Sequence, residues 1–236
     1  MILFLLISVS FFPLISFLVG KSPFSLKVAL SYLLGLIIST YLSFILHLFQ
    51  VPFEPSYFLG LLGLIFSVSY FTFKKNLTLP KLKDIKQLFK KIKSFQTLEK
   101  AVVGIIIFQF IFHMAYGLYW PVRDWDALTL YDFRAKVITQ TANLEFLEKN
   151  DSNYYLAYPL FTSLVHSFTY SLDVTSPMFF YSLLFISFSL CFYFLLRKKL
   201  NRTLALSFTL ILITSKVLFD HSLMAYTNLP YAMFLS

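Results

Sequence analysis

The sequence predicts an all-α protein that crosses a membrane several times and carries an extracytoplasmic loop of short amphipathic surface helices. Its composition, the length of its apolar runs and the placement of its charges predict this fold. Hydrophobic residues make up 58% of the 236 residues and charged residues only 13%, whereas soluble domains are nearer half apolar and a quarter charged. The mean hydropathy is +0.74. Several apolar runs reach the length of about 20 residues that crosses a bilayer.

Six apolar runs are predicted to be membrane-spanning helices, and a seventh begins near Pro230. The six runs are Ile2–Val19, Val28–Leu48, Phe58–Phe73, Ala101–Tyr119, Met178–Leu196 and Thr203–Phe219. No basic residue precedes the first run and no small-residue cleavage site follows it, so we expect a retained helix rather than a secretory signal. The chain stops inside the seventh run. A membrane protein rarely ends halfway through a spanning helix, because backbone groups in lipid must be paired within the helix. We therefore expect the chain to be a fragment.

Basic residues divide the loops into two sets. Nine lysines fall between Lys74 and Lys100, four basic residues follow the run that ends at Leu196, and the loop between the first two runs holds lysines as well. Lys and Arg concentrate on cytoplasmic loops. The sequence therefore predicts a multi-pass protein of the cell's cytoplasmic membrane, with the N-terminus and residues 119–158 extracytoplasmic. The short apolar segment Leu160–Leu172 would break this pattern if it crossed, so we expect it at the membrane interface.

Three regions follow from this layout. Residues 1–73 form three N-terminal helices, residues 74–100 form a basic amphipathic cytoplasmic segment, and residues 101–236 form the remaining membrane region. Apolar residues between Leu82 and Phe95 recur every three or four positions, which predicts a helix held on anionic lipid by its lysines. No aromatic stacking platform accompanies them, so we expect the lipid bilayer and no nucleic acid as the partner.

Acidic residues gather in the long outer loop. Residues 119–158 hold six of the eleven acidic residues, and Asp124 and Asp126 stand two apart just after the Ala101–Tyr119 helix. Apolar spacing from Ala127 onward predicts a short surface helix, with Asp132, Arg134 and Lys136 on its polar side. Asp132 and Lys136 are one turn apart and should pair.

The two outer-loop aspartates admit three readings. An aspartate at this point caps a helix well. A carboxylate at the water–lipid boundary can also take a proton from an acceptor hydroxyl, beside cations that neutralise a phosphate. Two carboxylates can instead contribute oxygen ligands to a divalent cation, so a divalent cation is the one cofactor the sequence suggests.

The stretch from Trp125 to Lys136, WDALTLYDFRAK, resembles the first outer loop of multi-pass GT-C glycosyltransferases of the protein-mannosyltransferase and aminoarabinose-transferase kind. Tyr158-Pro159-Leu160 resembles the element that begins a semi-buried helix after that loop. The residues after Phe219, including Asp220, His221 and the segment 226–230, resemble the second outer loop. The resemblance covers roughly residues 101–236.

The resemblance implies an enzyme that transfers a sugar with inversion from a polyprenyl-phosphate donor to a glycan, lipid or protein acceptor. It implies Asp126 as the catalytic base, with Asp124 as the second choice. It implies donor or substrate contacts from outer-loop residues: Arg123, Arg134, Lys136, Tyr158, Lys216, Asp220 and His221.

Other residues offer weaker signals. Lys216 and Asp220 are four residues apart near a span end, so a simple ion pair is an alternative to phosphate binding. His221 could bind phosphate or substrate, but an ordinary loop histidine is the simpler interpretation, and His166 on the short apolar segment is a weaker candidate. Cys191 is the single cysteine, so no internal disulfide can form.

Two other function classes stay open in the sequence. A multi-pass transporter or lipid flippase would place ionisable or helix-breaking residues near the membrane centre. A non-catalytic membrane subunit would present the acidic loop to a partner protein. The nearly charge-free spans favour the glycosyltransferase hypothesis over the transporter.

Overall fold

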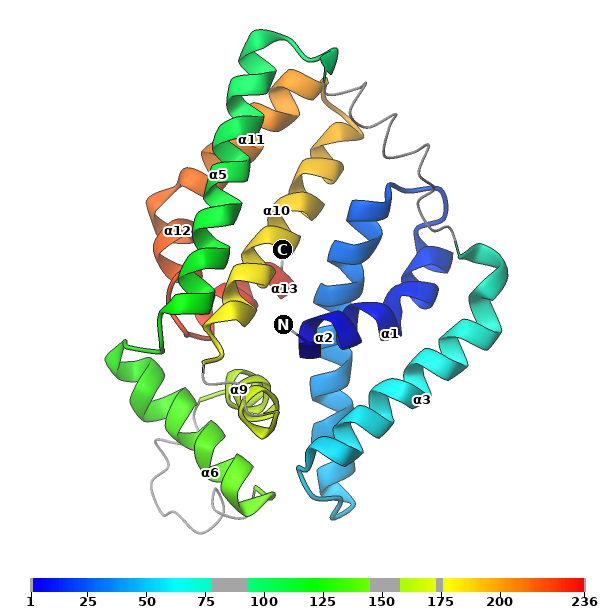
Figure 1. The fold of residues 1–236 in the computed structure, drawn as a ribbon, viewed down its shortest axis with the longest axis vertical. Coiled ribbons are helices and arrows are strands. Elements are labelled where there is room, and N and C mark those ends of the chain that lie inside the picture. Colours follow the sequence, from blue (N-terminus) through cyan, green and yellow to red (C-terminus); the bar gives the residue numbers. More distant parts are fainter. Residues whose placement is uncertain (1, 78–92, 145–157, 173–175, 236) are drawn as a thin grey trace.

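The structure, a computed structural model, describes residues 2–77, 93–144, 158–172 and 176–235 (Figure 1). These residues form helices joined by turns and loops, with no β-strand among them. Four helices there are long and apolar enough to cross a membrane: α2 (Phe24–Leu48), α3 (Pro55–Phe73), α5 (Thr97–Tyr119) and α10 (Met178–Arg197). A fifth span results if α11 (Arg202–Thr214) and α12 (Lys216–Ser222) are counted together. The all-α prediction is confirmed, and the length and composition of these helices indicate a membrane protein.

Two of the predicted spans differ from the helices observed. α1 (Ile2–Leu18) is apolar but only 17 residues long, with Pro13 inside it, so it is shorter than each of the four spans. The predicted span Thr203–Phe219 is not continuous, because α11 and α12 are bent by 63° at the break between them.

The break falls at Ser215, whose backbone is extended, with φ −61° and ψ 130°. The hydroxyls of Thr214 and Ser215 donate to the carbonyl oxygens of Leu210 and Leu212, at 2.7 Å each. Hydroxyl groups that bond back to the preceding turn bend helices, and here they stand where the helix direction changes.

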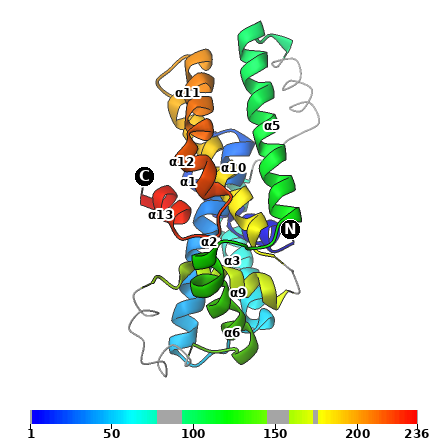
Figure 2. The same ribbon diagram turned by 90° about the vertical axis from the view of Figure 1, so that its left-hand side faces the viewer.

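Two groups of helices meet along α2 and α10 (Figure 1). α1 and α3 pack with α2, and α5 and α11 pack with α10. The Tyr32 hydroxyl of α2 donates to the Phe180 carbonyl of α10 at 3.2 Å, which joins the two groups. Gly35 lets α1 approach α2 closely, because a Cβ there would come within 2.7 Å of the Phe11 ring. Figure 2 shows both groups from the side.

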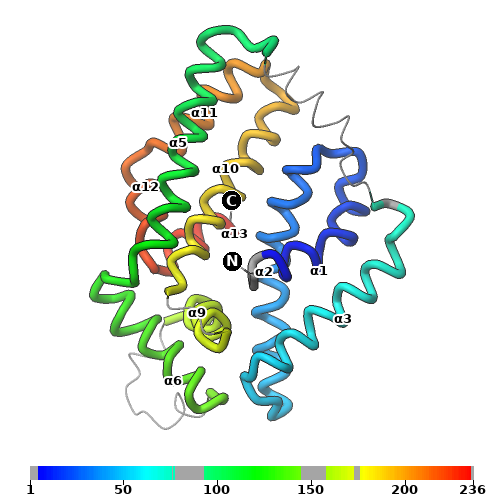
Figure 3. Tube along the Cα trace, in the orientation of Figure 1, coloured from blue at the N-terminus to red at the C-terminus, as the bar shows by residue number. Residues whose placement is uncertain are grey.

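The two kinds of loop lie at opposite ends of this bundle (Figure 3). At the basic end, which holds the α1–α2 turn, the start of α5 and the α10–α11 turn, Arg202 binds the Glu99 carboxylate with two nitrogens, at 2.6 and 2.8 Å. At the loop end, the α2–α3 turn meets α6 (Phe133–Thr141), and the Phe53 amide donates to the Ala142 carbonyl at 2.7 Å. The basic loops and the acidic loop, which the sequence separates, therefore lie at opposite ends of the molecule.

A short helix, α9 (Phe161–Ser171), lies at the loop end, and Figure 1 looks nearly along its axis. Its 11 residues extend about 16 Å, about half the hydrocarbon thickness. Residues 162–169 are all buried, against α6, α2 and α3. The helix is therefore too short to cross a bilayer by itself, and it is enclosed by other helices rather than spread on a surface. Its expected place at the membrane interface stays a prediction.

The predicted basic amphipathic helix between Leu82 and Phe95 lies almost wholly outside the described residues. The short last helix is α13 (Asn228–Leu235), which falls in the predicted seventh run.

Candidate functional site

The two aspartates Asp124 and Asp126 follow α5 directly at the loop end. Asp126 is exposed and Asp124 is half-buried, and Trp125 between them is 77% exposed. Asp126 stands at the N-cap position of η2 (Ala127–Asp132), but its side chain makes no capping hydrogen bond. Within the described residues, neither carboxylate forms an ion pair or a side-chain hydrogen bond. The capping alternative is thus not realised, and the carboxylate oxygens stay open to a ligand.

Tyr226, in the segment 226–230 of the predicted second outer loop, lies near Asp124 and Asp126. Burial raises the pKa of the Tyr226 hydroxyl, and the negative charges of Asp126 and Asp124 raise it further. The same hydroxyl lies against the Asp126 backbone. The fold therefore brings the two segments together at Asp126, although about one hundred residues separate them in the sequence.

Arg123 lies beside the aspartates but is directed toward aromatic rings. Its guanidinium carbon is 5.4 Å from the centre of the Tyr116 ring and 5.8 Å from that of Trp120. Stacking of this kind holds the planar group while leaving its N–H donors at the edge. Arg123 is exposed, so it remains a candidate for contact with an anionic ligand next to the carboxylates.

The prediction of an exposed polar side on the loop helix is wrong for two of the three residues assigned to it. Arg134 and Asp132 are each only 1% exposed, and only Lys136 faces outward. Arg134 donates to the Tyr158 carbonyl oxygen at 3.2 Å, so the two predicted substrate contacts bind each other. Arg134 therefore holds the loop in place from inside, whereas Tyr158 is half-buried.

The residues predicted on the second loop pair among themselves. Lys216 Nζ lies 2.6 Å from Asp220 Oδ2, and the Lys216 side chain is 88% exposed, so the predicted i,i+4 ion pair is confirmed. His221 is half-buried, and its Nδ1 has no hydrogen-bond partner in the described residues. The neighbouring Ser222 fixes α12 on α5, with its hydroxyl 2.7 Å from His113 Nε2.

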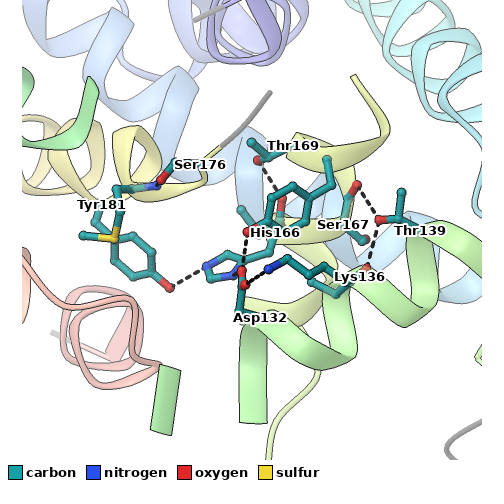
Figure 4. A network of polar contacts seen from close by, with 12 residues as sticks. Asp132, Lys136, Thr139, His166, Ser167, Thr169, Ser176 and Tyr181 are labelled. Carbon is teal, nitrogen blue, oxygen red and sulfur yellow. Dashed lines mark hydrogen bonds and ion pairs between the residues drawn. The ribbon is translucent and has the colours of Figure 1, made fainter. Parts of the chain in front are cut away.

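A buried polar network lies behind the loop, between α6, α9 and α10 (Figure 4). Lys136 Nζ is 2.8 Å from Asp132 Oδ2, and the Tyr170 hydroxyl donates to Asp132 Oδ1. His166 Nδ1 is 3.4 Å from the same Oδ1, and its Nε2 is 3.0 Å from the Tyr181 hydroxyl. One buried carboxylate thus collects three polar partners from two helices.

The protonation states in this network follow from burial and contact. Burial alone would raise the pKa of Asp132, but contacts with His166, Lys136 and Tyr170 outweigh it and lower the pKa to about 2. Burial lowers the pKa of His166, against the opposite pull of Asp132. At neutral pH the network therefore holds an ionised Asp132 beside a neutral His166.

The network reaches toward the aspartate loop through two threonines. Thr162, one turn before His166 on α9, lies 3.1 Å from Thr227, oxygen to oxygen. Thr227 is buried and directly follows Tyr226. The interior of the loop end is therefore tied to the residue that contacts Asp126.

Sequence reasoning missed His166, Tyr170 and Tyr181 as parts of one network. A signal was present, because His166 and Tyr170 stand four residues apart on α9, as do Asp132 at the end of η2 and Lys136 on α6. Two such pairs can face each other when their helices pack. The structure gives one further signal, because η2 is a π-helix. π-Helices are rare in proteins, and those that occur are often found at functional sites.

The described residues contain no group of three or more His, Cys, Asp or Glu side chains that could hold a metal ion. Asp124 and Asp126 are two carboxylates, and a cation bound there would need further ligands from solvent or substrate. In the comparisons with known proteins, no family model, no curated protein and no solved structure matches the chain.

Proposed function

We propose that the chain is a membrane glycosyltransferase that moves a sugar from a polyprenyl-phosphate donor to an acceptor on the extracytoplasmic face. The proposal is carried by one observation: Asp126 is an exposed carboxylate without a cationic partner among the described residues, held beside Tyr226 at the loop end. A general base needs a carboxylate that is ionised, accessible and not already neutralised.

In the proposed reaction, Asp126 takes the proton from the acceptor hydroxyl as its oxygen attacks C1 of the sugar. The C1–O bond to the donor phosphate breaks, and the electron pair leaves with the polyprenyl phosphate. Attack opposite the leaving group inverts the configuration at C1. A base placed in this way contributes about 10²- to 10⁴-fold to the rate. Asp124 is the second candidate for this role.

The cations divide into different proposed roles. Arg123, exposed and stacked on Tyr116 and Trp120, is the proposed contact to the donor phosphate. Lys216 and Lys136 are engaged with Asp220 and Asp132, and each would have to exchange its partner to bind the phosphate. Arg134 is proposed to position the loop through Tyr158.

The orientation is part of the proposal. The positive-inside rule places the basic end, with Arg202 and its neighbours, in the cytoplasm and the loop end outside. Trp120 and Trp125 are both exposed at the loop end, where aromatic side chains favour the membrane–water boundary. These observations support the proposal that Asp126 acts at the depth where the phosphate of a lipid-linked donor meets an acceptor from the aqueous side.

Transport is a second candidate function, favoured by the 63° break between α11 and α12. Transporters often build their substrate site where a spanning helix is interrupted. In this chain the residues next to the break are an exposed ion pair, Lys216 and Asp220.

One experiment separates these functions. The purified chain is reconstituted in vesicles with a radiolabelled polyprenyl-phosphate sugar and a mixture of glycan and peptide acceptors. A transferase moves the label to a water-soluble or acceptor-bound form and releases polyprenyl phosphate. Movement of intact donor across the bilayer would instead establish a transporter, and absence of both would overturn the proposal in favour of a non-catalytic subunit.

A further inference from the structure

Two adjoining cavities follow the contact between α2 and α10, away from the proposed catalytic loop. The first, of about 340 Å³, opens at the basic end, and its lining includes Ser22, Leu26, Phe194 and Lys198. The second, of about 620 Å³, lies deeper and is lined by apolar side chains of α2, α10, α11 and α13. Both cavities are lined by Leu30, Cys191 and Leu195, so they adjoin within the same helix contact.

The mouth of the first cavity is positively charged. Lys198 lines it and is exposed, and Lys21 directly precedes the lining residue Ser22. α2 begins at Phe24 with no side-chain cap, and its first paired amide is that of Lys27. The amides before Lys27 add the partial positive charge of a helix N-terminus to that of the lysines.

The depth of the pair of cavities matches one leaflet of a bilayer. The lining residues of α2 run from Leu26 to Ile37, which is about 16 Å at 1.5 Å per residue. One leaflet of the hydrocarbon core is about 15 Å deep, half of about 30 Å. A charged mouth above an apolar groove of this depth has the dimensions of a phospholipid.

We infer that the contact between α2 and α10 binds an anionic phospholipid from the leaflet at the basic end. The phosphate lies at Lys198 and the α2 N-terminus, and the acyl chains lie against Leu33, Leu34 and Phe188. Basic pockets between membrane helices bind anionic headgroups in this way. This site lies at the opposite end from Asp126, so it goes beyond the proposed sugar transfer and does not depend on it.

The test uses the full chain in phosphatidylcholine vesicles that contain phosphatidylglycerol with a photoactivatable group in one acyl chain. Crosslinked peptides are identified by mass spectrometry. We expect crosslinks to concentrate on the lining residues of α2 and α10, and unlabelled phosphatidylglycerol to displace them. Crosslinks spread evenly over the lipid-facing sides of α3 and α5, or displaced equally well by phosphatidylcholine, would overturn the inference.

Two matched pairs of variants test the headgroup and the groove separately. Lys198→Gln is expected to lower crosslinking about five-fold, which corresponds to about 1 kcal/mol for one basic side chain at an anionic surface. Lys199→Gln is the control and should leave crosslinking unchanged, because Lys199 lies outside the cavity lining. Leu34→Trp fills the groove and should lower crosslinking further. Leu59→Trp on α3 is its control and should not lower crosslinking, since both leucines are 38% exposed but only Leu34 lines the groove.

Equal crosslinking in Lys198→Gln and wild type would overturn the headgroup assignment. Displacement by inorganic phosphate alone would show a site for free phosphate and would overturn the assignment to a lipid.

Discussion

Asp132 at the end of η2 and His166 in the middle of α9 lie 3.4 Å apart in the interior, Oδ1 to Nδ1. They come from two of the elements at the loop end, and both are buried. A buried carboxylate is costly unless polar partners surround it. The contact therefore fixes how η2, which begins right after Asp126, sits on the rest of the protein.

Replacing Asp132 should destabilise the loop end. Asp132→Ala leaves His166 and Tyr170 without their shared partner, and the loss of one member of a buried polar group costs about 3 kcal/mol. Lys136→Ala is the control, because the Lys136 side chain is 55% exposed and an exposed pair contributes under about 1 kcal/mol. Thermal unfolding in detergent, followed by circular dichroism, measures both. Equal melting temperatures for Asp132→Ala and wild type would show that the network does not stabilise the fold.

Stability should fall in two steps on acidification. His166 has a folded pKa below its usual 6.5, so the unfolded state takes up a proton first and stability falls as the pH drops below about 6.5. Asp132 has a folded pKa of about 2 against an ordinary 3.8, so its contribution is present above 3.8 and is lost between about 4 and 2.

Melting temperatures measured across this pH range test both steps. His166→Gln should remove the upper step and Asp132→Asn the lower one. Stability that rises as the pH falls from 6.5 would contradict the protonation states assigned here.

Gly117 on α5 should tolerate no side chain. A Cβ there would lie 2.9 Å from the Phe179 Cα and 3.0 Å from the Met178 carbonyl oxygen of α10, so both helices would have to shift. Gly117→Ala should cost about 1–3 kcal/mol. Gly104→Ala, on the same helix with nothing within 4 Å of its Cβ, should be neutral or stabilise by up to about 1 kcal/mol. A Gly117→Ala protein at least as stable as Gly104→Ala would refute the close contact.

The proposed orientation predicts which cysteines an impermeant reagent can reach. In a Cys191→Ala background, Gln50→Cys at the loop end and Lys199→Cys at the basic end are both on exposed positions. A membrane-impermeant maleimide applied to intact cells should label Gln50→Cys at once and Lys199→Cys only after permeabilisation. The reverse pattern would place Asp126 on the cytoplasmic side and remove the basis for extracytoplasmic transfer.

Much of the fold could be predicted because membrane spans are recognised from local composition. The apolar runs that became α2, α3, α5 and α10 needed no knowledge of their neighbours, and the two ion pairs at i,i+4 spacing followed from helix geometry alone. The break at Ser215 escaped prediction because Ser and Thr are common in continuous membrane helices as well.

The interior of the loop end could not be predicted because burial there is decided by α9, which packs onto α6 from about 30 residues away. Charged residues such as Asp132 and Arg134 are predicted to be exposed unless partners are known, and Asp132 finds His166 and Tyr170 only in the folded state. The sequence did place Asp124 and Asp126 on the outer loop. Their approach to Tyr226 is a long-range contact that no local pattern encodes.

Sugar transfer by Asp126→Asn in reconstituted vesicles, with Glu54→Gln as the control, tests the proposed catalytic base most directly. Both variants exchange an exposed carboxylate at the loop end for its amide, but Glu54 lies between α2 and α3 and has no part in the proposed site. We predict normal insertion for both variants, a loss of about 10²- to 10⁴-fold in kcat for Asp126→Asn, and little change for Glu54→Gln. Full transfer activity in a normally inserted Asp126→Asn protein would contradict the assignment of Asp126 as the base.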